Sequence, residues 1–399
     1  MKILLVHNYY QLPGGEDAVF DHDRKILEQG GHEVLTYCRS NNELSEMSLA
    51  QRMLSLDSFI SSGQTKREIA ELLRRHKPDL VHVYNTFTMI TPAVFDACRQ
   101  AGVPTVLAVQ NYRLLCPTAT LFREGKICNE CQEHGLWNSV KHACYRESRF
   151  TTAAMALSLE TYRRRGTWNT HVDAYIVPSQ FVKQKLTETS IPKAKVFLRP
   201  NFLSSDPKPR KSPGSYALFV GRLSQEKGLC TLLNAWKLAR VDMPLRIVGD
   251  GPLRPSIESQ IAASGLNNVV LSGWLDRSAV HRAIQQAQFL IFPSEWYEPF
   301  GLTIVEAFAC GVPVIGSRLG AVQELIDDNR TGLLFSASNA EDLAKKINWA
   351  FTHPEELRAM GHAARQKYEQ QYSAEVNYAR LLSIYSHLLE RNAPNTATL

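Results

Sequence analysis

The sequence contains no long hydrophobic run. Among its 399 residues, no unbroken apolar stretch approaches the roughly 18–20 residues that a membrane-spanning helix needs. Residues 1–6 form a short apolar segment without the charged start, long apolar centre and small-residue cleavage site of a secretory leader. These absences argue against an integral membrane protein and against a secreted one. We expect a cytoplasmic protein with, at most, peripheral contact at the inner face of the membrane.

A dinucleotide-binding fingerprint is also absent. The segment Leu12-Pro13-Gly14-Gly15-Glu16 follows the first apolar run but does not have the form G-x-G-x-x-G, so no nicotinamide site is predicted. Its two glycines still allow the backbone to approach a ligand closely where a helix begins. The sequence also lacks the interleaved basic and aromatic residues of a nucleic-acid binder, a partner class that we do not expect.

The overall composition is that of a folded protein, with 44% hydrophobic and 21% charged residues. The length suits two domains of about 150–200 residues each. In both halves, apolar runs of strand length alternate with helical patterns, which favours parallel sheets covered on both faces. The clearest runs are 2–7, 79–84, 104–110, 216–221, 289–294 and 312–317. The sequence therefore predicts an α/β fold of two doubly wound, Rossmann-like domains that face a cleft.

The expected boundary between the domains lies in a segment rich in proline and serine at 203–214, which we interpret as a linker. The first domain is expected at 1–202 and includes a cysteine-rich insert at 112–150. The second domain is expected at 215–375. The remaining residues, 376–399, are expected to form a helix that crosses back to the first domain.

The most specific motif runs from Ser294 to Ala307, where a predicted strand ends and a helix begins. Glu298 lies just before the helix, and Glu306 lies about one turn inside it. The amides at the start of this helix are expected to be unpaired and able to bind an anion, and they belong to Phe300, Gly301, Leu302 and Thr303. Two carboxylates beside an anion site suit a ligand that presents hydroxyl groups. The alternative is a capped helix with an incidental pair of acids.

A second motif, Gly221-Arg222 followed by Lys227, lies where the first strand of the second domain ends. Gly221 permits a tight turn. For binding a diphosphate, Arg222 supplies a planar guanidinium group and Lys227 supplies a compact ammonium group. The same cations suit the stabilisation of charge on a leaving phosphate. Gly249 is expected to play a similar turn role. The alternative is a basic pair on the surface that binds no ligand.

With these motifs, the chain resembles the family 4 retaining glycosyltransferases of the GT-B fold over nearly its whole length, most densely from Gly221 to Glu324. The resemblance implies transfer of a sugar from a UDP- or GDP-sugar, with retention at the anomeric carbon and no metal in catalysis. The acceptor is expected to be a saccharide or a lipid-linked molecule in the assembly of surface polysaccharide or glycolipid.

The resemblance also implies roles for individual residues. Arg222 and Lys227 would hold the donor diphosphate, Glu298 would contact the transferred sugar, and Glu306 would hold the ribose. The glycine pair of the first domain would close over the diphosphate. The complete donor-binding set is Gly14, Gly15, Gly221, Arg222, Lys227, Gly249, Phe300, Gly301, Leu302, Thr303 and Glu306.

One position departs from the family pattern. Similar sequences end the strand at 104–110 with a histidine that donates a hydrogen bond toward the donor sugar, whereas this chain has Gln110. Gln110 is able to donate through its amide but cannot carry a charge, and we favour its action as a neutral catalytic donor. His82 is a weaker candidate to replace the histidine. The alternatives are a catalytically weak nucleotide-sugar-binding or scaffold protein and a GT-B-like sugar-nucleotide epimerase.

Four cysteines cluster in the insert, and Cys128 and Cys131 form a C-x2-C pair between Cys116 and Cys144. Four thiolates at this spacing predict a closed, structural zinc site, with neighbouring histidines as possible substitutes for one ligand. The alternative is four free cysteines. The resemblance agrees with zinc only in that a surface-polysaccharide subgroup of the family carries a similar segment.

Positive charge concentrates in one region. Residues 141–200 contain eleven Lys and Arg against four Asp and Glu, an excess of seven. The region includes a helical pattern that begins apolar and ends in Arg163-Arg164-Arg165. It predicts contact with anionic lipid headgroups or with an anionic lipid-linked acceptor. The alternative is the solvated end of a helix.

Overall fold

The computed structural model describes residues 1–11, 14–43 and 63–392. Leu12 and Pro13 of the glycine-rich motif lie outside the described residues, as do residues 393–399 of the expected terminal helix. The chain divides into two compact units. The first comprises Met1–Leu121, Asn129–Ser204 and Ala374–Leu399, and the second comprises Phe122–Cys128 and Ser205–Ser373.

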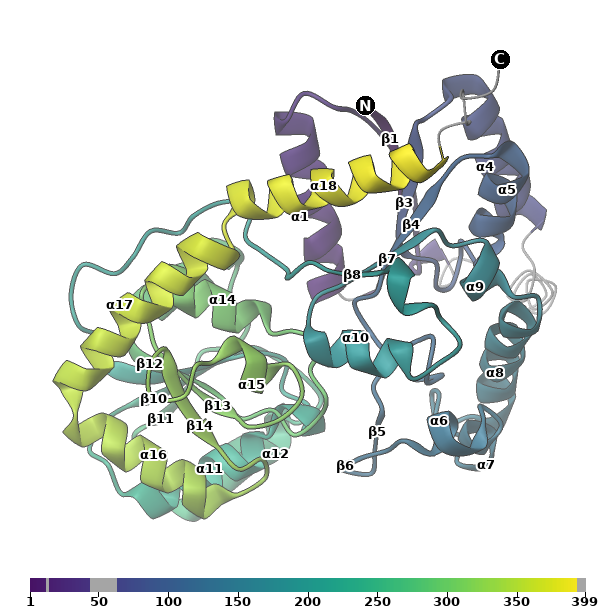
Figure 1. Cartoon of the computed structure of the whole chain (residues 1–399). Helices are drawn as coiled ribbons and strands as arrows, with labels where there is room; N and C mark the ends of the chain where they lie inside the picture. Colours follow the sequence, from purple (N-terminus) through teal and green to yellow (C-terminus); the bar gives the residue numbers. More distant parts are fainter. Residues whose placement is uncertain (12–13, 44–62, 393–399) are drawn as a thin grey trace. The chain divides into compact units, whose positions relative to one another are not determined.

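The first unit is built on a parallel sheet with the strand order β2-β1-β3-β4-β7-β8 (Figure 1). Its strands are β1 (Lys2–Tyr9), β2 (Glu33–Ser40), β3 (Leu80–Asn85), β4 (Thr105–Ala108), β7 (Ala174–Val177) and β8 (Val196–Leu198). Every residue of β3, β4 and β7 is buried, as expected for central strands with helices on both faces. The strand order reverses between β1 and β3, the kind of position where open α/β sheets bind ligands.

The described helices of the first unit come from residues 15–187 and from the helix at 374–392. They are α1 (Gly15–Gln29), α4 (Gly63–His76), α5 (Ala93–Ala101), α6 (Glu130–His134), α7 (Asn138–Lys141), α8 (Arg149–Arg164), α9 (Thr167–Thr170), α10 (Gln180–Thr187) and α18 (Ala374–Asn392). Figure 1 shows α18, in yellow, crossing α1, in purple, and the two helices are in contact.

A buried ion pair fastens α18 to the first unit. The Arg199 guanidinium lies 2.5 Å from the Asp23 carboxylate, and its Nε donates to the backbone oxygen of Asn377 in α18 at 3.2 Å. Near it, the ring of His82 hydrogen-bonds through Nδ1 to the Tyr385 hydroxyl at 2.7 Å. Burial lowers the pKa of His82 to about 3. His82 is therefore a neutral packing residue under α18, and this location speaks against its replacing the family histidine.

The second unit repeats the plan with the strand order β11-β10-β9-β12-β13-β14, all parallel. The strands are β9 (Tyr216–Val220), β10 (Leu245–Val248), β11 (Val269–Leu271), β12 (Ala287–Phe292), β13 (Val314–Ser317) and β14 (Gly332–Phe335). The helices are α11 (Leu229–Ala239), α12 (Arg254–Ser264), α13 (Arg277–Gln285), α14 (Leu302–Ala309), α15 (Val322–Leu325), α16 (Ala340–Thr352) and α17 (Pro354–Gln371). The predicted class of two doubly wound, Rossmann-like α/β domains is confirmed.

Two boundaries differ from the expected ones. The insert was expected to lie wholly in the first domain, but residues 122–128, with strands β5 (Phe122–Arg123) and β6 (Lys126–Ile127), group with the second unit. The reason is close packing: a Cβ at Gly125 would lie 2.8 Å from the Gln225 side chain.

The expected linker at 203–214 also joins the second unit from Ser205 onward. Asp206 accepts hydrogen bonds from the Arg365 guanidinium at 2.7 and 2.8 Å. Arg210 donates to the backbone oxygen of Ala287 at 2.7 Å. These contacts fix a segment whose proline and serine content alone indicated a free connection.

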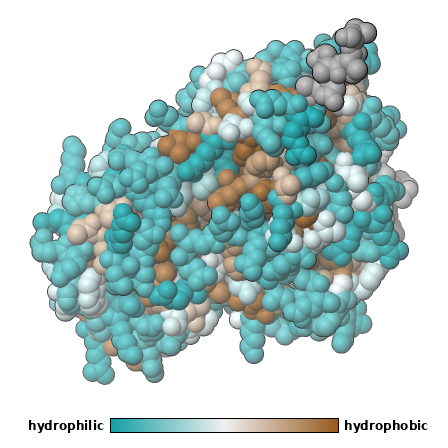
Figure 2. All heavy atoms as spheres, viewed as in Figure 1, coloured by the Kyte–Doolittle hydropathy of each residue, from teal (hydrophilic) through white to brown (hydrophobic). Residues whose placement is uncertain are grey.

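None of the described helices is long and apolar enough to cross a membrane. The face seen in Figure 2 is mainly hydrophilic, and its hydrophobic atoms form separate patches. The large apolar side chains exposed in the described part of the chain include Trp137, Phe150, Leu157, Leu238, Val270 and Trp274.

Candidate functional site

The two motifs of the second unit meet where β9 and β12 end, the neighbouring strands at which its strand order reverses. Gly228 brings them together. Its φ is +68°, and a Cβ at this position would lie 1.9 Å from the backbone oxygen of Pro293. Only glycine fits such an approach, because any side chain would collide with backbone. The loop before α11 is thereby held against the loop after β12.

This approach places Lys227 beside Glu298. The Lys227 ammonium lies 2.5 Å from Glu298 Oε1, and the Ser294 hydroxyl donates to the same oxygen at 2.7 Å. The Glu298 side chain is 7% exposed and that of Lys227 is 22% exposed. Both bonds are charge-assisted and therefore stronger than neutral ones. The structure thus joins one residue of each predicted motif in a single ion pair.

Arg222 lies on the same edge, directly after β9, with an exposed side chain. It forms no ion pair with any residue that the structure describes, so its guanidinium is available to a ligand. The loop that carries it is shaped by Gly249 at the end of β10, which has φ +139°. A Cβ at Gly249 would lie 1.9 Å from the backbone oxygen of Gly221, so the two turns are in direct contact.

Helix α14 supplies the other predicted groups. Gly301 is its N-cap, and Leu302 and Thr303 open its first turn, where backbone amides have no intrahelical acceptor. Phe300, just before the cap, is buried and packs edge-on against the Tyr372 ring. The amides at this helix start therefore suit an anion, and their binding of a donor phosphate stays a prediction.

Glu306 lies one turn into α14 with a side chain that is 14% exposed. Two residues of α13 face its Oε1 atom: His281 Nε2 at 3.4 Å and Arg277 Nε at 3.9 Å. The sequence motifs did not include these two residues. Their spacing of four on a predicted helix places them on one face, but nothing local shows that this face meets Glu306.

In the first unit, Gly14 is the N-cap of α1 and Gly15 is its first residue. The Gly14 amide donates to Asp17 Oδ2 at 2.9 Å, and Asp17 Oδ1 lies 2.7 Å from His7 Nε2. Among the described residues, none would lie within 4 Å of a Cβ at Gly14, so no packing contact described for this unit demands a glycine there.

Gln110 follows β4, and its side chain has a defined partner. Asn201 Nδ2 donates to Gln110 Oε1 at 2.7 Å. With the oxygen engaged, the Gln110 amide nitrogen is the end left to donate to another group. The orientation of both amides follows from this hydrogen bond. The role of Gln110 as a neutral donor stays a prediction.

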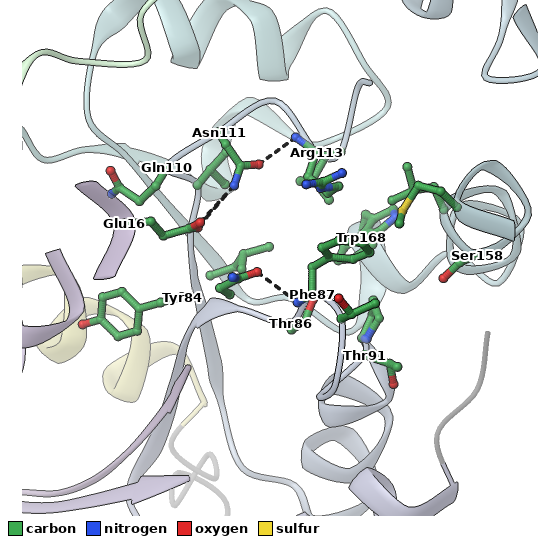
Figure 3. A pocket seen from close by; sticks show the side chains of 18 of the residues that line it. Glu16, Tyr84, Thr86, Phe87, Thr91, Gln110, Asn111, Arg113, Ser158 and Trp168 are labelled. Atoms are coloured by element: carbon green, nitrogen blue, oxygen red, sulfur yellow. Dashed lines mark hydrogen bonds between the residues drawn. The ribbon is translucent and has the colours of Figure 1, made fainter. Parts of the chain in front are cut away.

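A pocket of about 1150 Å³, its open mouth included, lies in the first unit at the ends of β3 and β4 (Figure 3). Glu16 and Gln110 line it on one side, and Ser158 of α8 reaches it from another. Asn111 Nδ2 donates to Glu16 Oε2 at 3.1 Å, and the Tyr10 hydroxyl donates to the same oxygen at 2.7 Å. Burial raises the pKa of Glu16 to about 6. The sequence motifs did not single out Glu16 or Asn111 as functional.

Two of the four clustered cysteines are in contact. A hydrogen bond from Cys131 lowers the pKa of the Cys116 thiol to about 5, and both residues are buried. Cys128 and Cys144 are partly exposed. Among the residues with described positions, no three histidines, cysteines or acids are grouped so as to hold a metal ion. The described geometry does not form the expected four-thiolate cage, and zinc stays a prediction.

Comparison with known proteins defines the class. The model for glycosyltransferase family 4 matches residues 24–206, and the model for glycosyl transferases group 1 matches residues 203–367. The two matches together span 24–367. With two Rossmann-like units and these matches, the chain is a glycosyltransferase of the GT-B type. More specifically, it belongs to glycosyltransferase family 4, as the resemblance implied.

Two curated relatives match the chain over less than half of its length. The chain is 34% identical over 161 residues, 40% of its length, to the D-rhamnosyltransferase WbpZ of Pseudomonas aeruginosa. It is 28% identical over 178 residues, 44% of its length, to the O-antigen chain mannosyltransferase C of Escherichia coli. The matches cover 42% and 47% of those proteins, so the chain spans about half the length of these curated relatives.

Among solved structures, HepE of Anabaena in complex with UDP is similar over 97% of this chain and 100% of that one, with a TM-score of 0.71. At 18% identity, this similarity supports the fold alone.

Proposed function

We propose that the protein is a retaining glycosyltransferase that transfers a sugar from a UDP- or GDP-sugar to a saccharide or lipid-linked acceptor. The observation that carries the proposal is the Lys227–Glu298 ion pair beside the start of α14. It combines a cation, a buried carboxylate and helix amides in one place, which suits a ligand with both phosphate and hydroxyl groups.

In the proposed reaction, the cationic side chains and the helix amides act on the phosphate groups of the donor. Arg222 and Lys227 bind the diphosphate and neutralise the charge that grows on it as the sugar leaves. The amides of Leu302 and Thr303 contribute to the same stabilisation. Because fixed cations and amides supply this charge, the proposed reaction needs no catalytic metal. The leaving phosphate then assists in removing the proton of the attacking acceptor hydroxyl on the same face of the sugar.

The carboxylates hold hydroxyl groups. Glu298, already oriented by Lys227 and Ser294, positions the transferred sugar, and Glu306 binds the ribose. Gln110 donates from its amide nitrogen toward the sugar in place of the family histidine. UDP is supported by the similarity in fold to HepE, which was solved with UDP, whereas GDP rests on the family resemblance alone.

A thermal-shift screen against UDP, GDP, ADP and dTDP, each with and without an attached sugar, tests the donor. A ligand at 100 times its dissociation constant stabilises by about 2.7 kcal/mol, which moves the melting temperature visibly. We expect a shift with one base that Arg222→Ala and Glu306→Ala abolish. The absence of a shift with every nucleotide would contradict the proposal.

Hydrolysis of the donor without acceptor separates an enzyme from a scaffold that only binds nucleotide sugars. We expect slow hydrolysis by the wild type that Glu298→Gln removes while nucleotide binding remains. Equal background rates for both proteins would favour the scaffold. Formation of an epimeric sugar nucleotide would favour an epimerase.

For the acceptor side, we propose action in surface polysaccharide or glycolipid assembly, with contact between α8 and an anionic membrane at the cytoplasmic face. Phe150 and Leu157, seven residues apart on one face of α8, are 66% and 42% exposed. Exposed arginines stand at both ends, among them Arg149 and Arg164. Apolar side chains flanked by cations suit the boundary between headgroups and acyl chains.

A further inference from the structure

The pocket of the first unit has an apolar floor. Its buried lining side chains come from strands β3 and β4 and from helices α5, α8 and α9, and they include Phe95, Leu107, Val109, Met155, Leu159 and Trp168. A bare saccharide can pack a C–H face on such a floor, but the hydroxyl groups around its ring find no hydrogen bonds there. The floor suits an aliphatic or isoprenoid group, which gains by leaving water.

The charged groups among the described residues of the pocket are few, and although burial raises the pKa of the Glu16 carboxyl, Arg113 is near enough to lower it in part. Glu16 is the one carboxylate among its lining residues, and it lies next to Asn111 and Gln110. The cations are Arg113 and Arg146. Hydroxyl recognition is therefore available at the Glu16 end of the pocket, while anion recognition belongs to the two arginines.

Both arginines contact the same aromatic ring, that of Tyr145. The guanidinium carbons of Arg113 and Arg146 lie 5.8 and 5.6 Å from the centre of the Tyr145 ring. Arg113 also stacks on Phe87 at 4.3 Å. Neither arginine forms an ion pair with an acid in the described part of the chain. Arg113 already donates to the Pro117 backbone oxygen, so its remaining N–H groups and the exposed guanidinium of Arg146 are the donors that suit a phosphate.

We propose that this pocket binds a phosphate-bearing amphiphile, whose phosphate lies at Arg113 and Arg146 and whose apolar chain lies on the floor beside α8. The inference rests on the proposed function, because the acceptor hydroxyl of such a molecule would then face Glu16 and Gln110. It narrows the acceptor from any saccharide to one that is linked through phosphate to a lipid.

Helix α8 connects this pocket with the proposed membrane surface. Thr151, Ala154 and Ser158 line the pocket, whereas Phe150 and Leu157 face outward from the same helix. A lipid-linked acceptor would therefore enter beside the helix that rests on the bilayer.

Binding of farnesyl phosphate, measured by calorimetry below its micelle concentration, tests the inference without any sugar donor. Farnesol lacks the phosphate, and inorganic phosphate lacks the chain. We expect saturable binding of farnesyl phosphate that is at least about tenfold tighter than that of either control compound, since both halves contribute. No binding, or farnesol binding as tightly as its phosphate, would overturn the inference.

A matched pair of variants locates the binding. Ala154→Phe fills the pocket from α8, whereas Ala153→Phe adds the same volume at the next residue, which is equally half-buried but does not line the pocket. We expect Ala154→Phe and Arg146→Gln each to weaken binding about tenfold or more, with Ala153→Phe unchanged. Equal effects of the two alanine variants would place the ligand elsewhere.

The same samples keep the two proposals distinguishable. A nucleotide-induced thermal shift in a protein that ignores farnesyl phosphate would retain the transferase and remove the lipid-phosphate acceptor. Binding of farnesyl phosphate without any nucleotide effect would retain the lipid-phosphate site but contradict the transferase, and with it the role of the bound molecule as acceptor.

Discussion

Glu16 is the residue with the clearest pH dependence. Its pKa is raised from the ordinary 4.5 to about 6 by burial, so folding makes it harder to ionise. The folded chain binds more protons than the unfolded chain between these values, and stability falls as pH rises through the window. Glu16→Gln removes this penalty. We expect the variant to gain up to about 2 kcal/mol relative to wild type at pH 8 and nothing at pH 4.

Urea unfolding at a series of pH values from 4 to 8 measures the effect. Glu28→Gln, an exposed change on the same helix, is the control for the substitution itself. If the stability difference between Glu16→Gln and the wild type is the same at every pH, the raised pKa of Glu16 is contradicted.

Lys227 and Glu298 form the ion pair on which the donor site depends. Lys227→Met leaves a buried carboxylate without its cation, which costs about 1–3 kcal/mol. Adding Glu298→Gln removes the unpaired charge, so the double variant should regain stability yet remain inactive. A double-mutant cycle from denaturation and donor hydrolysis measures both quantities. Additive losses of stability would show that the pair is not coupled.

Among elements, α8 is the one expected to contact a membrane. Phe150→Ser together with Leu157→Ser should reduce co-sedimentation with anionic phospholipid vesicles several-fold, because it removes two apolar groups from the contact. Leu238→Ser is the matched control, since Leu238 is also exposed, at 53%, but lies on α11. Salt should weaken binding of the wild type, because attraction to anionic headgroups is screened. Equal retention by all variants would reject this helix as the contact.

The cysteine-rich segment makes a separate prediction. If Cys116, Cys128, Cys131 and Cys144 hold zinc, purified protein should contain about one zinc per chain, and a chelator should lower its melting temperature. Cys128→Ser should lose the metal, whereas Cys98→Ser, at a cysteine outside the cluster, should keep it. Metal-free protein with four titratable thiols in the segment would support the free-cysteine alternative.

At the scale of the molecule, α18 completes the first unit. The buried Arg199–Asp23 pair also contacts the backbone of Asn377, so its loss leaves an uncompensated charge beside the helix. We expect Arg199→Met to destabilise the first unit by about 3–5 kcal/mol. Denaturant unfolding followed by hydrogen exchange should show the loss there and not in the second unit. Exposed Arg391→Met is the control.

The alternation of apolar strands and helices was enough to predict both sheets, because a buried parallel strand must be apolar throughout. The donor motifs were also visible, since Lys227 and Glu298 each follow a strand within a short, unusual segment. Their ion pair spans 71 residues and could not be predicted locally.

What the sequence missed depends on distant contacts. Asn111 lies 95 positions from Glu16, and no local pattern indicates their hydrogen bond. The pocket floor combines five elements whose apolar residues individually look like ordinary core. Residues 122–128 and 205–214 were misassigned for the same reason, because composition does not reveal which surface a loop packs against.

The return of α18 to the first unit also governs how the protein is made. Asn377 is 178 residues beyond Arg199, so a ribosome adding about 5–20 residues per second exposes the rest of the first unit for about 10–35 s before its last helix emerges. The second unit, apart from residues 122–128, is contiguous and can close during that interval. During synthesis, the half of the protein that begins the chain is thus the half that is finished last.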